Sequence, residues 1–529
     1  MTPRAGRGAV CVYFLALLLL GLFVVRDYGV PWDEPRQRVI GGVSARYVLQ
    51  TLAPSRPLPA SLPDSPLATF GDRDYGVAFE APAVAMELLL GLTDSRDIYL
   101  VRHLLTYLVF LAGVFAVYRM GTRRFDDWRL GLCAATMLVL SPRFFAEAFY
   151  NSKDVVFMAC FAVATNTMLA FVTRPGIRTA SLHALATAVA IDVRVAAILL
   201  VPMTLGLGLV ETIKRRRPYG HQAALAAVFL GVGALFVVLL FPWLWENPVG
   251  RFASAVRNMS SFQRFSERVR YLGDSLMPDD LPWHYVPVWV AISTPLPYVG
   301  LSLAGAVGAL AGFARRHVRL WEDEGQMQDL VFLSLACAPP LLVMTTHSVV
   351  YDGWRHLYFI YPSLLLLATR GLAGIWTLTA SFRAARYALV AVLVLHAGVT
   401  TAWMIRAHPM QNVYFNVLAG SDWRRTHEVD YWGLGNRAAV EYLLAHDPSP
   451  TFTLRTESFT DLGNTLLLLR PADRARVRIV DKDQPAKYVL NNYRNADVDA
   501  ADRWSTRRLF YRLVVDGEVI LSVYETLEG

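Results

Sequence analysis

GAVCVYFLALLLLGLFVVR at residues 8–26 runs directly into DYGVPWDEPR at residues 27–36, so an apolar run is followed at once by an acidic segment. The first run is long enough to cross about 30 Å of hydrocarbon as a helix, which takes roughly 17 to 25 residues. Comparable runs follow at 98–118, 130–149, 154–173, 222–242, 287–313, 328–346, 356–378 and 384–405. This pattern predicts a polytopic α-helical membrane protein.

The composition supports this fold class. Of the 529 residues, 54% are hydrophobic and 18% are charged, which excludes a disordered chain and is too apolar for an ordinary soluble enzyme. The formal net charge of +8 could indicate a nucleic-acid partner, but the arginines lie between apolar runs, so we expect none. The cysteines, Cys11, Cys133, Cys160 and Cys337, lie inside apolar runs without paired spacing. We expect buried hydrophobic side chains there, and neither disulfides nor a zinc site.

Two regions need separate treatment. Residues 181–210 are too long for one span and are interrupted by Asp192 and Arg194, which predicts two short helices or a re-entrant pair and about eleven spans in all. The apolar piece 77–92 carries two glutamates and is expected to lie on the outer surface as an amphipathic helix. A cleaved signal peptide at 8–26 is disfavoured because no small-residue cleavage site follows it.

Basic residues orient the bundle. They precede the first span and recur in alternate connections: Arg4, Arg7, Arg119, Arg123, Arg124, Arg129, Arg174, Arg178, Lys214, Arg215, Arg216, Arg217, Arg315, Arg316, Arg319, Arg383 and Arg386. Because Lys and Arg accumulate in cytoplasmic loops, we expect this side and the N-terminus to be cytoplasmic.

The opposite, extracytoplasmic side then holds the candidate functional regions. We expect a membrane domain over 1–405 with outer loops at 27–97 and 243–287, and a small extracytoplasmic α/β domain over 406–529. The patterns within this tail predict a helix at 436–446, strands at 451–455, 477–480 and 487–490, and a hairpin of 509–515 with 519–524 around Asp516-Gly517.

Two adjacent carboxylates, Asp33 and Glu34, come directly after the first span. Most such pairs are solvated loop acids, and that is one interpretation. Pro31, Trp32 and Pro35 stiffen and partly cover this pair, however, and a carboxylate held in this way can act as a general base whose pKa is tuned by its neighbours.

A second acidic position lies in the short connection between the spans at 130–149 and 154–173. Asp154 could cap the following helix and Lys153 could reach the lipid head groups. A connection this short also holds both side chains at the mouth of the bundle. Glu80 is a third outer acid, which could belong to the polar face of the surface helix.

Basic and aromatic groups occur on the same side at the start of the span over 356–378. Arg355 and His356, with Tyr351 before them, would suit a phosphate held at a helix N-terminus. Interfacial anchoring is the alternative, since Tyr and Arg are common at membrane borders. Arg194 lies within an apolar region, where it is either a functional group or one half of an ion pair with Asp192.

Acids and a phosphate-binding group on one face indicate transfer from a phosphorylated, membrane-embedded donor, with a carboxylate deprotonating the acceptor. A cytosolic nucleotide-sugar enzyme would carry its acids and arginines on the other side, and the sequence has no G-x-x-x-x-G-K-[ST] phosphate loop there.

At this point the sequence resembles the GT-C glycosyltransferases, in particular the protein O-mannosyltransferases and aminoarabinose lipid A transferases of bacteria. The resemblance is carried by the acid pair after the first span, by Lys153-Asp154, by the topology, and by the segments YDGWRHLYFIYP at 351–362, NVYFN at 412–416 and DYWG at 430–433. The tail lacks an evident β-trefoil repeat, and the segment around Glu80 matches the family only approximately.

The resemblance implies an inverting transfer of a sugar from a polyprenyl-phosphate-linked donor to a glycan, lipid or protein acceptor, in a bacterial inner membrane. It makes Asp33 the catalytic base, with Glu34 as a positioning or second acid. Asp154, Glu80 and Lys153 become acceptor or cation groups. The donor phosphate would be bound by Arg355, His356, Arg194 and Tyr351.

Two further expectations remain. No soluble cofactor is needed; a divalent cation bridging Asp33 or Asp154 to phosphate would fit the chemistry, but two scattered acids do not define a metal site. The alternative function is a transporter or flippase of a lipid-linked or anionic substrate, for which Asp192 and Arg194 would be the substrate or proton-relay charges.

Overall fold

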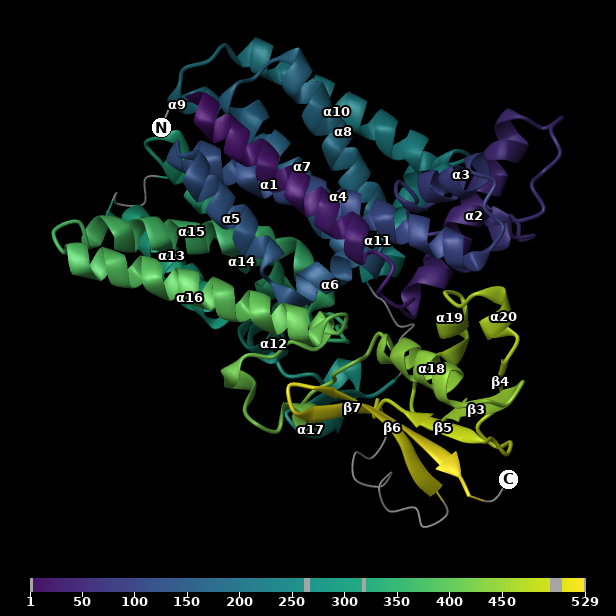
Figure 1. Cartoon of the computed structure of the whole chain (residues 1–529). Helices are drawn as coiled ribbons and strands as arrows, with labels where there is room; N and C mark the ends of the chain where they lie inside the picture. The colour runs from purple at the N-terminus through teal and green to yellow at the C-terminus, as the bar shows by residue number, and fades with distance from the viewer. Residues whose placement is uncertain (1–2, 261–266, 316–319, 495–506, 528–529) are drawn as a thin grey trace.

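The computed structural model describes residues 3–260, 267–315, 320–494 and 507–527. A bundle of long helices makes up most of the molecule, and a sheet domain formed by the C-terminal part lies against one end of the bundle (Figure 1). The N-terminus and the connection between the last two long helices lie at the other end. Two of the arginines used for orientation, Arg316 and Arg319, lie outside the described residues.

The helices of the bundle follow the apolar runs of the sequence. They are α1 Pro3–Val24, α4 Ser95–Phe125, α5 Trp128–Val139, α6 Pro142–Tyr150, α7 Asp154–Thr173, α8 Ile177–Val193, α9 Leu200–Lys214, α10 Tyr219–Leu240, α13 Leu296–Arg315, α14 Glu324–Thr346, α15 Tyr361–Leu378 and α16 Arg383–Ala407. The 3₁₀ turns η2 Val195–Leu199 and η5 Arg355–Ile360 lead into α9 and α15.

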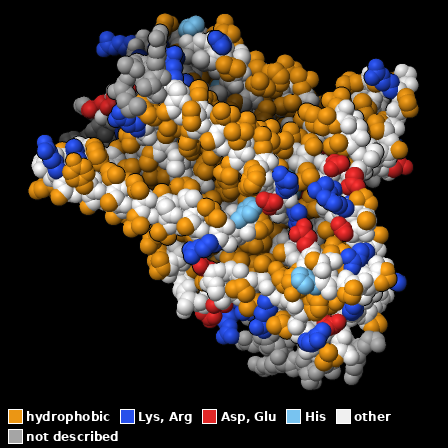
Figure 2. All heavy atoms as spheres, viewed as in Figure 1, with side chains coloured by type: hydrophobic (Ala, Val, Ile, Leu, Met, Phe, Trp, Pro, Cys, Tyr) orange, Lys and Arg blue, Asp and Glu red, His pale blue; other side chains and the backbone are white. Residues whose placement is uncertain are grey.

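Within the described ranges, nine helices are long and apolar enough to cross a membrane, or ten if the bent pair α5–α6 is one span. Helix α8, with 17 residues, packs against α7 and α10 but is not among these helices, so their number stays below the expected eleven. Large hydrophobic side chains are exposed on α1, α13 and α16, among them Leu15, Leu303 and Leu395. Figure 2 shows hydrophobic side chains over most of the bundle and many charged ones where it meets the C-terminal domain. This surface suits lipid, and the chain is an integral membrane protein.

Three apolar runs contain helix breaks. The run at 130–149 bends by 72° between α5 and α6, where Pro142 begins α6. The run at 287–313 is divided into α12 and α13 at Thr294, whose extended backbone is typical of a residue before proline. Predicting one straight span for each was wrong. The predicted interruption of 181–210 is confirmed, because α8 ends at Val193 and Arg194 is extended.

The bundle is tightly packed where small residues let helices approach. A Cβ at Gly305 on α13 would lie 1.9 Å from the Leu367 carbonyl of α15, and one at Gly371 would lie 2.2 Å from the Leu301 carbonyl. Only glycine allows this approach. Cys11 and Cys337 are exposed on α1 and α14, and Cys133 and Cys160 are half-buried, so the prediction of four buried cysteines is wrong, most clearly for the first two. Their helix faces meet the lipid side, where a small apolar side chain is equally well accommodated.

The connecting segments carry shorter elements. They are α2 Asp33–Leu52, η1 Leu67–Thr69, α3 Glu80–Leu89, η3 Pro242–Leu244, α11 Pro248–Ser260, β1 Val269–Tyr271, β2 Asp274–Leu276, η4 Pro278–Asp280 and α12 Tyr285–Ser293. The acid pair therefore begins a helix. The sequence predicts a loop here, and that expectation is wrong. Helix α3, with 10 residues, is too short to span, as predicted for 77–92.

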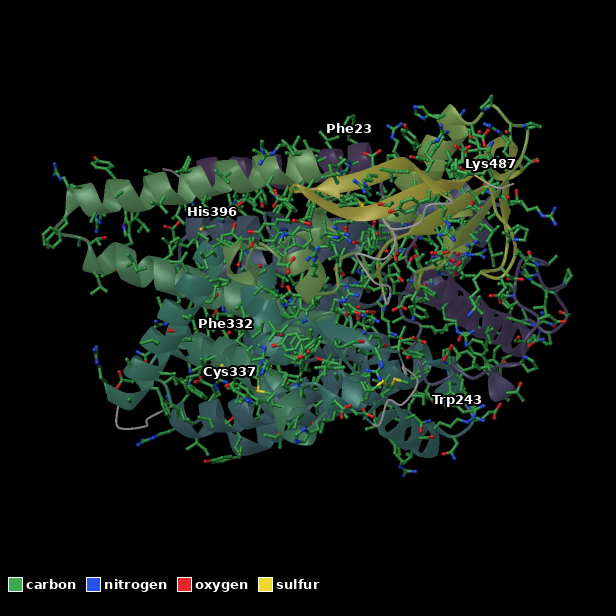
Figure 3. The ribbon with its side chains drawn as sticks, turned by 90° about the horizontal axis from the view of Figure 1, so that it is seen from below. Phe23, Trp243, Phe332, Cys337, His396 and Lys487 are labelled. Carbon is green, nitrogen blue, oxygen red and sulfur yellow. The ribbon has the colours of Figure 1, made fainter. Side chains whose placement is uncertain are left out.

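The C-terminal domain has a five-stranded sheet in the order β4-β3-β5-β7-β6. Its elements are η6 Gln411–Val413, η7 Val417–Ala419, α17 Trp423–Thr426, α18 Gly435–His446, β3 Phe452–Thr456, α19 Leu462–Leu466, α20 Pro471–Arg474, β4 Val477–Ile479, β5 Tyr488–Asn491, β6 Arg507–Val515 and β7 Glu518–Thr526. The predicted helix, strands and hairpin are confirmed. In Figure 3, seen from below, the yellow domain that carries Lys487 lies beside the bundle, and Phe332 and Cys337 lie on the side of the bundle away from Lys487.

Candidate active site

The segment between α1 and α2 is held from both sides. The buried Tyr28 ring stacks on Phe149 of α6, with ring centroids 4.5 Å apart. On the other side, the Trp32 ring stacks on Phe459 of the C-terminal domain at 5.0 Å. These contacts fix the start of α2 at the junction between the bundle and the C-terminal domain, with Asp33 as its first residue.

The centre of this junction is the guanidinium of Arg355, at the start of η5. Its Nη1 donates to Asp33 Oδ2 (2.9 Å) and to Asp154 Oδ2 (3.1 Å), and its Nη2 lies 3.3 Å from Asp352 Oδ2. Arg355 is 3% exposed, whereas the Asp33 side chain is 34% exposed. We call these four side chains the Arg355 group. Asp33 and Arg355, which the sequence places on the same side of the bundle, are thus in direct contact.

Asp154 joins a second arginine to this group. Asn151 Oδ1 accepts from the backbone N–H of Asp154 (2.7 Å), the first residue of α7, and Lys153 occupies the N-cap position, so the interpretation of Asp154 as the cap is wrong. The Asp154 carboxylate instead pairs with Arg194, whose partner was expected to be Asp192. Asp192 accepts from the backbone N–H of Ala78. The break after α8 is what turns Arg194 toward α7.

The remaining predicted phosphate-binding residues border the Arg355 group. The Tyr351 ring lies below the Arg355 guanidinium, 4.9 Å from Cζ to the ring centroid, and the His356 ring contacts Tyr351 edge-on at 4.7 Å. His356 Nδ1 makes no hydrogen bond with any described residue. The Lys153 ammonium lies 4.3 Å from the Tyr75 ring centroid and acts electrostatically on Asp33.

Three residues of the junction were missed as site residues from sequence. Asp352 bridges two arginines, because its Oδ1 accepts from Arg494 Nη2 of the C-terminal domain (2.6 Å) while its Oδ2 faces Arg355. The Trp432 ring covers the Arg355 guanidinium at 4.9 Å. Asp352 and Gly353 have φ values of 55° and 71°, so the Asp-Gly pair was a readable turn signal. Trp432 lies in the DYWG segment that carries the resemblance but was given no role there, and nothing local marked Arg494.

The two carboxylates outside the spans respond differently to this environment. Burial raises the pKa of Asp33, but the charges of Arg355 and Lys153 outweigh it, and the pKa of Asp33 lies below its ordinary value. For Asp352, burial prevails over the charges of Arg494 and Arg355, so its pKa is raised. Asp33 is therefore ionised at neutral pH. It pairs with Arg355, and a bound anion could replace Asp33 as the partner of this arginine.

Glu34 and Glu80 belong to a separate buried cluster around Arg102 of α4, which we call the Arg102 group. Arg102 Nη2 pairs with Glu80, its Nη1 donates to Glu87 Oε1 (3.0 Å), and its Nε lies 3.9 Å from Glu34 Oε1. Glu34 Oε2 also lies 3.0 Å from His103 Nε2. The interpretation of Glu80 as part of an exposed polar face is wrong, because Glu80 is 3% exposed.

Asp33 and Glu34 contact different arginines because they occupy consecutive positions of a helix. Neighbouring side chains on a helix point about 100° apart, so one of the pair reaches Arg355 and the other reaches Arg102. Ser152, in the turn before α7, donates to Glu80 Oε1 (2.8 Å) and so ties this turn to the Arg102 group. The Arg102 group thus positions α2 and the α6–α7 turn.

We expect Arg102→Met to destabilise the fold strongly. The substitution would remove the cation that three buried carboxylates share and leave Glu80 without an ion-pair partner, although Glu87 keeps Arg38; breaking a buried ion pair costs about 3–5 kcal/mol. Thermal unfolding in detergent should show a clearly lower midpoint than for Arg96→Met, since Arg96 on the same helix is only half-buried. Equal midpoints for the two variants would show that the Arg102 group has no structural role.

The described residues contain no group of three or more His, Cys, Asp or Glu side chains that could hold a metal ion. Asp33 and Asp154, the acids considered for a divalent cation, both accept from Arg355. The charge that faces them is thus supplied by arginine.

Comparison with solved structures identifies the fold. Over 90% of its length, the chain matches the oligosaccharyltransferase of Archaeoglobus fulgidus in the apo form, with a TM-score of 0.51 and 10% identity. It spans 65% of the length of that protein. This likeness confirms the predicted GT-C fold.

Two further similar structures are ArnT from Cupriavidus metallidurans in the apo state (TM-score 0.49, 16% identity, 98% of both chains) and bound to undecaprenyl phosphate (TM-score 0.48, 16% identity, 97% of this chain and 98% of that one). No protein-family model and no curated protein matches the sequence.

Proposed function

We propose that this chain is a membrane glycosyltransferase that moves a sugar from a polyprenyl-phosphate-linked donor to an acceptor at the extracytoplasmic face of a bacterial inner membrane. The observation that carries the proposal is the Arg355 group, in which three carboxylates share one buried guanidinium at the end of the bundle next to the C-terminal domain. The GT-C fold supports it, although a fold alone does not set a function.

The donor phosphate would bind beside Asp154, where the guanidinium groups of Arg355 and Arg194 lie close together. Arg355 and Arg194 both pair with Asp154, which holds the two guanidinium groups at one place. A phosphate group can accept two parallel hydrogen bonds from one guanidinium fork, whereas here the Arg355 fork is divided between separate carboxylates. His356 Nδ1, which has no partner among the described residues, would donate a further hydrogen bond.

The reaction would be a single displacement with inversion at the anomeric carbon. The acceptor oxygen or nitrogen forms a bond to this carbon as the bond between the carbon and the phosphate oxygen breaks. Asp33 takes the acceptor proton, and the electron pair leaves with polyprenyl phosphate. Arg355 and His356 stabilise the charge that develops on the leaving phosphate. Glu34 acts only by positioning α2 through the Arg102 group.

Donor binding should activate the base. In the free protein, Arg355 and Lys153 hold the pKa of Asp33 below its ordinary value, so Asp33 is a weak base. A phosphate that pairs with Arg355 neutralises this field and adds negative charge, so the pKa of Asp33 rises in the complex.

This gives a pH prediction with a definite sign. The pH profile of kcat/KM for the donor reports groups of the free enzyme, and that of kcat reports the complex. Since a carboxylate base is lost as pH falls through its pKa, the acid limb of kcat should lie at higher pH than the acid limb of kcat/KM. Coincident limbs, or the opposite order, would contradict activation by the donor.

The function itself can be tested in cells of the source bacterium. Mass spectrometry of cell-envelope glycans and glycolipids, with and without the gene, should show one envelope component that lacks a sugar residue in the deletion strain. Wild-type protein should restore the sugar, and Asp33→Asn should not. If Asp33→Asn restores it fully, the chain does not transfer the sugar itself, and a flippase or transporter is the better interpretation.

A further inference from the structure

Glu147 on α6 is a buried carboxylate that the proposed reaction does not use. The residue is fully buried, and three neutral groups donate hydrogen bonds to it. Tyr358 OH donates to Oε1 at 2.8 Å, Tyr431 OH donates to the same oxygen at 3.4 Å, and Asn151 Nδ2 donates to Oε2 at 2.7 Å. Burying a carboxylate is costly unless such bonds are made. The donors come from η5, the C-terminal domain and the turn before α7, so Glu147 joins these three parts.

Asn151 connects Glu147 to the Arg355 group. Its Nδ2 donates to Asp154 Oδ2 at 3.3 Å as well as to Glu147, and its Oδ1 accepts from the backbone N–H of Asp154 at 2.7 Å. Because an ionised carboxylate can only accept hydrogen bonds, the amide nitrogen of Asn151 is the atom that must face the two acids. Asn151 therefore holds both the backbone and the side chain of Asp154.

The orientation of the Asp154 carboxylate decides where two arginines lie. Its Oδ2 accepts from Arg355 Nη1 at 3.1 Å and from Asn151, and its Oδ1 pairs with Arg194. The last torsion of an aspartate side chain has broad preferences, so the direction of the carboxylate is set by these partners. Without the Asn151 contact, the carboxylate could turn, and the two guanidinium groups would no longer be held at one place.

Helix α6 is itself held by the C-terminal domain, which it faces at the end of the bundle (Figure 1). Arg143, one turn before Glu147, donates from Nη1 to Tyr431 OH at 3.4 Å and from Nη2 to the Tyr414 carbonyl at 3.2 Å. Its guanidinium also lies 5.4 Å from the centroid of the Phe415 ring. These partners belong to the NVYFN and DYWG segments, which the proposed reaction leaves without a role. The two segments thus fix the helix that carries Glu147.

We propose that Glu147 and Asn151 are positioning residues for binding of the donor phosphate. Glu147 orients the Asn151 amide, and this amide orients the Asp154 carboxylate. Asp154 in turn holds Arg355 and Arg194 together where the phosphate would bind. Neither Glu147 nor Asn151 touches the reacting atoms. This inference rests on the proposed function and deepens it by naming the groups that set the geometry of the phosphate site.

Two substitutions of Glu147 separate positioning from charge. Both remove the carboxylate, and the loss of a negative charge near the arginines would by itself strengthen the binding of an anion. Glu147→Gln keeps an oxygen that accepts from Asn151, and its amide can donate to the Tyr358 hydroxyl, whereas Glu147→Leu keeps neither contact.

The probe is undecaprenyl phosphate, titrated against the detergent-purified full-length chain and followed by tryptophan fluorescence. We expect Glu147→Gln to bind it as tightly as wild type or more tightly. Glu147→Leu should bind it about tenfold more weakly or worse, which is the direction opposite to the effect of charge alone.

Asn151→Leu removes the same link without changing any charge and should weaken binding to a similar extent. Asn416→Leu is the matched control. Asn416 is also buried, and its Nδ2 donates to the carbonyl groups of Ala291 and Thr294 at 2.6 Å each, which lie outside the Arg355 group. This control should leave the affinity unchanged even where it lowers the melting midpoint, which is measured for every variant. If Glu147→Leu does not fold, Asn151→Leu decides the matter.

Steady-state kinetics give a second readout. A loss of folded protein lowers the apparent kcat and leaves KM unchanged, whereas a displaced phosphate site raises the donor KM. Glu147→Leu should therefore raise the donor KM by about tenfold or more, with a smaller change in kcat and an unchanged acceptor KM.

The outcomes separate this inference from the proposed function. If folded Glu147→Leu and Asn151→Leu bind undecaprenyl phosphate as wild type does, the inference is overturned and the function stands. If the variants weaken binding as expected but the wild-type protein transfers no sugar, positioning of the lipid phosphate is supported and the proposed function is rejected. If wild-type protein does not bind undecaprenyl phosphate saturably, both are overturned.

Discussion

Replacing Asp33 by Asn will lower kcat by about 10²- to 10⁴-fold and leave donor binding in place. Asn has nearly the same size as Asp, and its side-chain oxygen can still accept from Arg355 Nη1, so the junction should keep its geometry. What is lost is the group that takes the acceptor proton. Because removing the negative charge leaves Arg355 more available to phosphate, the donor KM should stay the same or fall.

Asp27→Asn provides the matched control for this prediction. Asp27 lies at the same end of the bundle and carries a 40% exposed carboxylate that binds His408 Nε2 at 2.9 Å, but it does not touch the Arg355 group. Steady-state kinetics with a labelled polyprenyl-phosphate donor should show near-normal kcat for Asp27→Asn. Normal turnover by Asp33→Asn would remove Asp33 as the base, and an equal loss in both variants would indicate a general electrostatic effect.

Replacing Arg355 by Lys should reduce kcat/KM for the donor by about 10²- to 10³-fold. The two terminal nitrogens of the guanidinium serve three carboxylates from α2, α7 and the turn before η5. A lysine ammonium is a point charge on a flexible stem and cannot keep this geometry while it also binds a phosphate. Part of the loss should appear as a higher donor KM and part as a lower kcat, since the developing charge on phosphate loses a donor.

Arg370→Lys is the control for Arg355→Lys. Arg370 lies further along α15, where its Nε donates to Asp329 Oδ2 at 2.7 Å, away from the junction. Its replacement should leave the donor kinetics unchanged. Thermal unfolding of both variants in detergent shows whether the site remains folded. Wild-type donor kinetics in a folded Arg355→Lys protein would exclude Arg355 from phosphate binding.

Much of the fold could be predicted because apolarity and alternation are local signals. The runs of apolar residues located the spans, and short alternating stretches located β3, β5 and the β6–β7 hairpin. The breaks at Pro142 and Thr294 were missed because each run was judged by its overall apolarity, although Ser141-Pro142 and Thr294-Pro295 are local break signals. Apolarity indicates that a segment lies in a membrane, but it does not indicate that the helix is continuous there.

The candidate site could be predicted in part, for a similar reason. Asp33, Asp154 and Arg355 each lie next to the end of a span on the same side, so topology alone brings them together. Arg494 comes from a domain where charged residues are ordinary, and only long-range packing places it beside Asp352. Glu34 was grouped with Asp33 because the expected loop would not separate neighbours, whereas the first turn of a helix does.

The most direct test of the account is to follow the donor itself. Purified protein in detergent, given a polyprenyl-phosphate-linked sugar and an envelope fraction as acceptor, should release free polyprenyl phosphate while one equivalent of sugar appears in the acceptor. Asp33→Asn should leave the donor intact. If the wild-type protein leaves the sugar–phosphate bond intact under conditions in which the donor binds, the Arg355 group is not a site of sugar transfer.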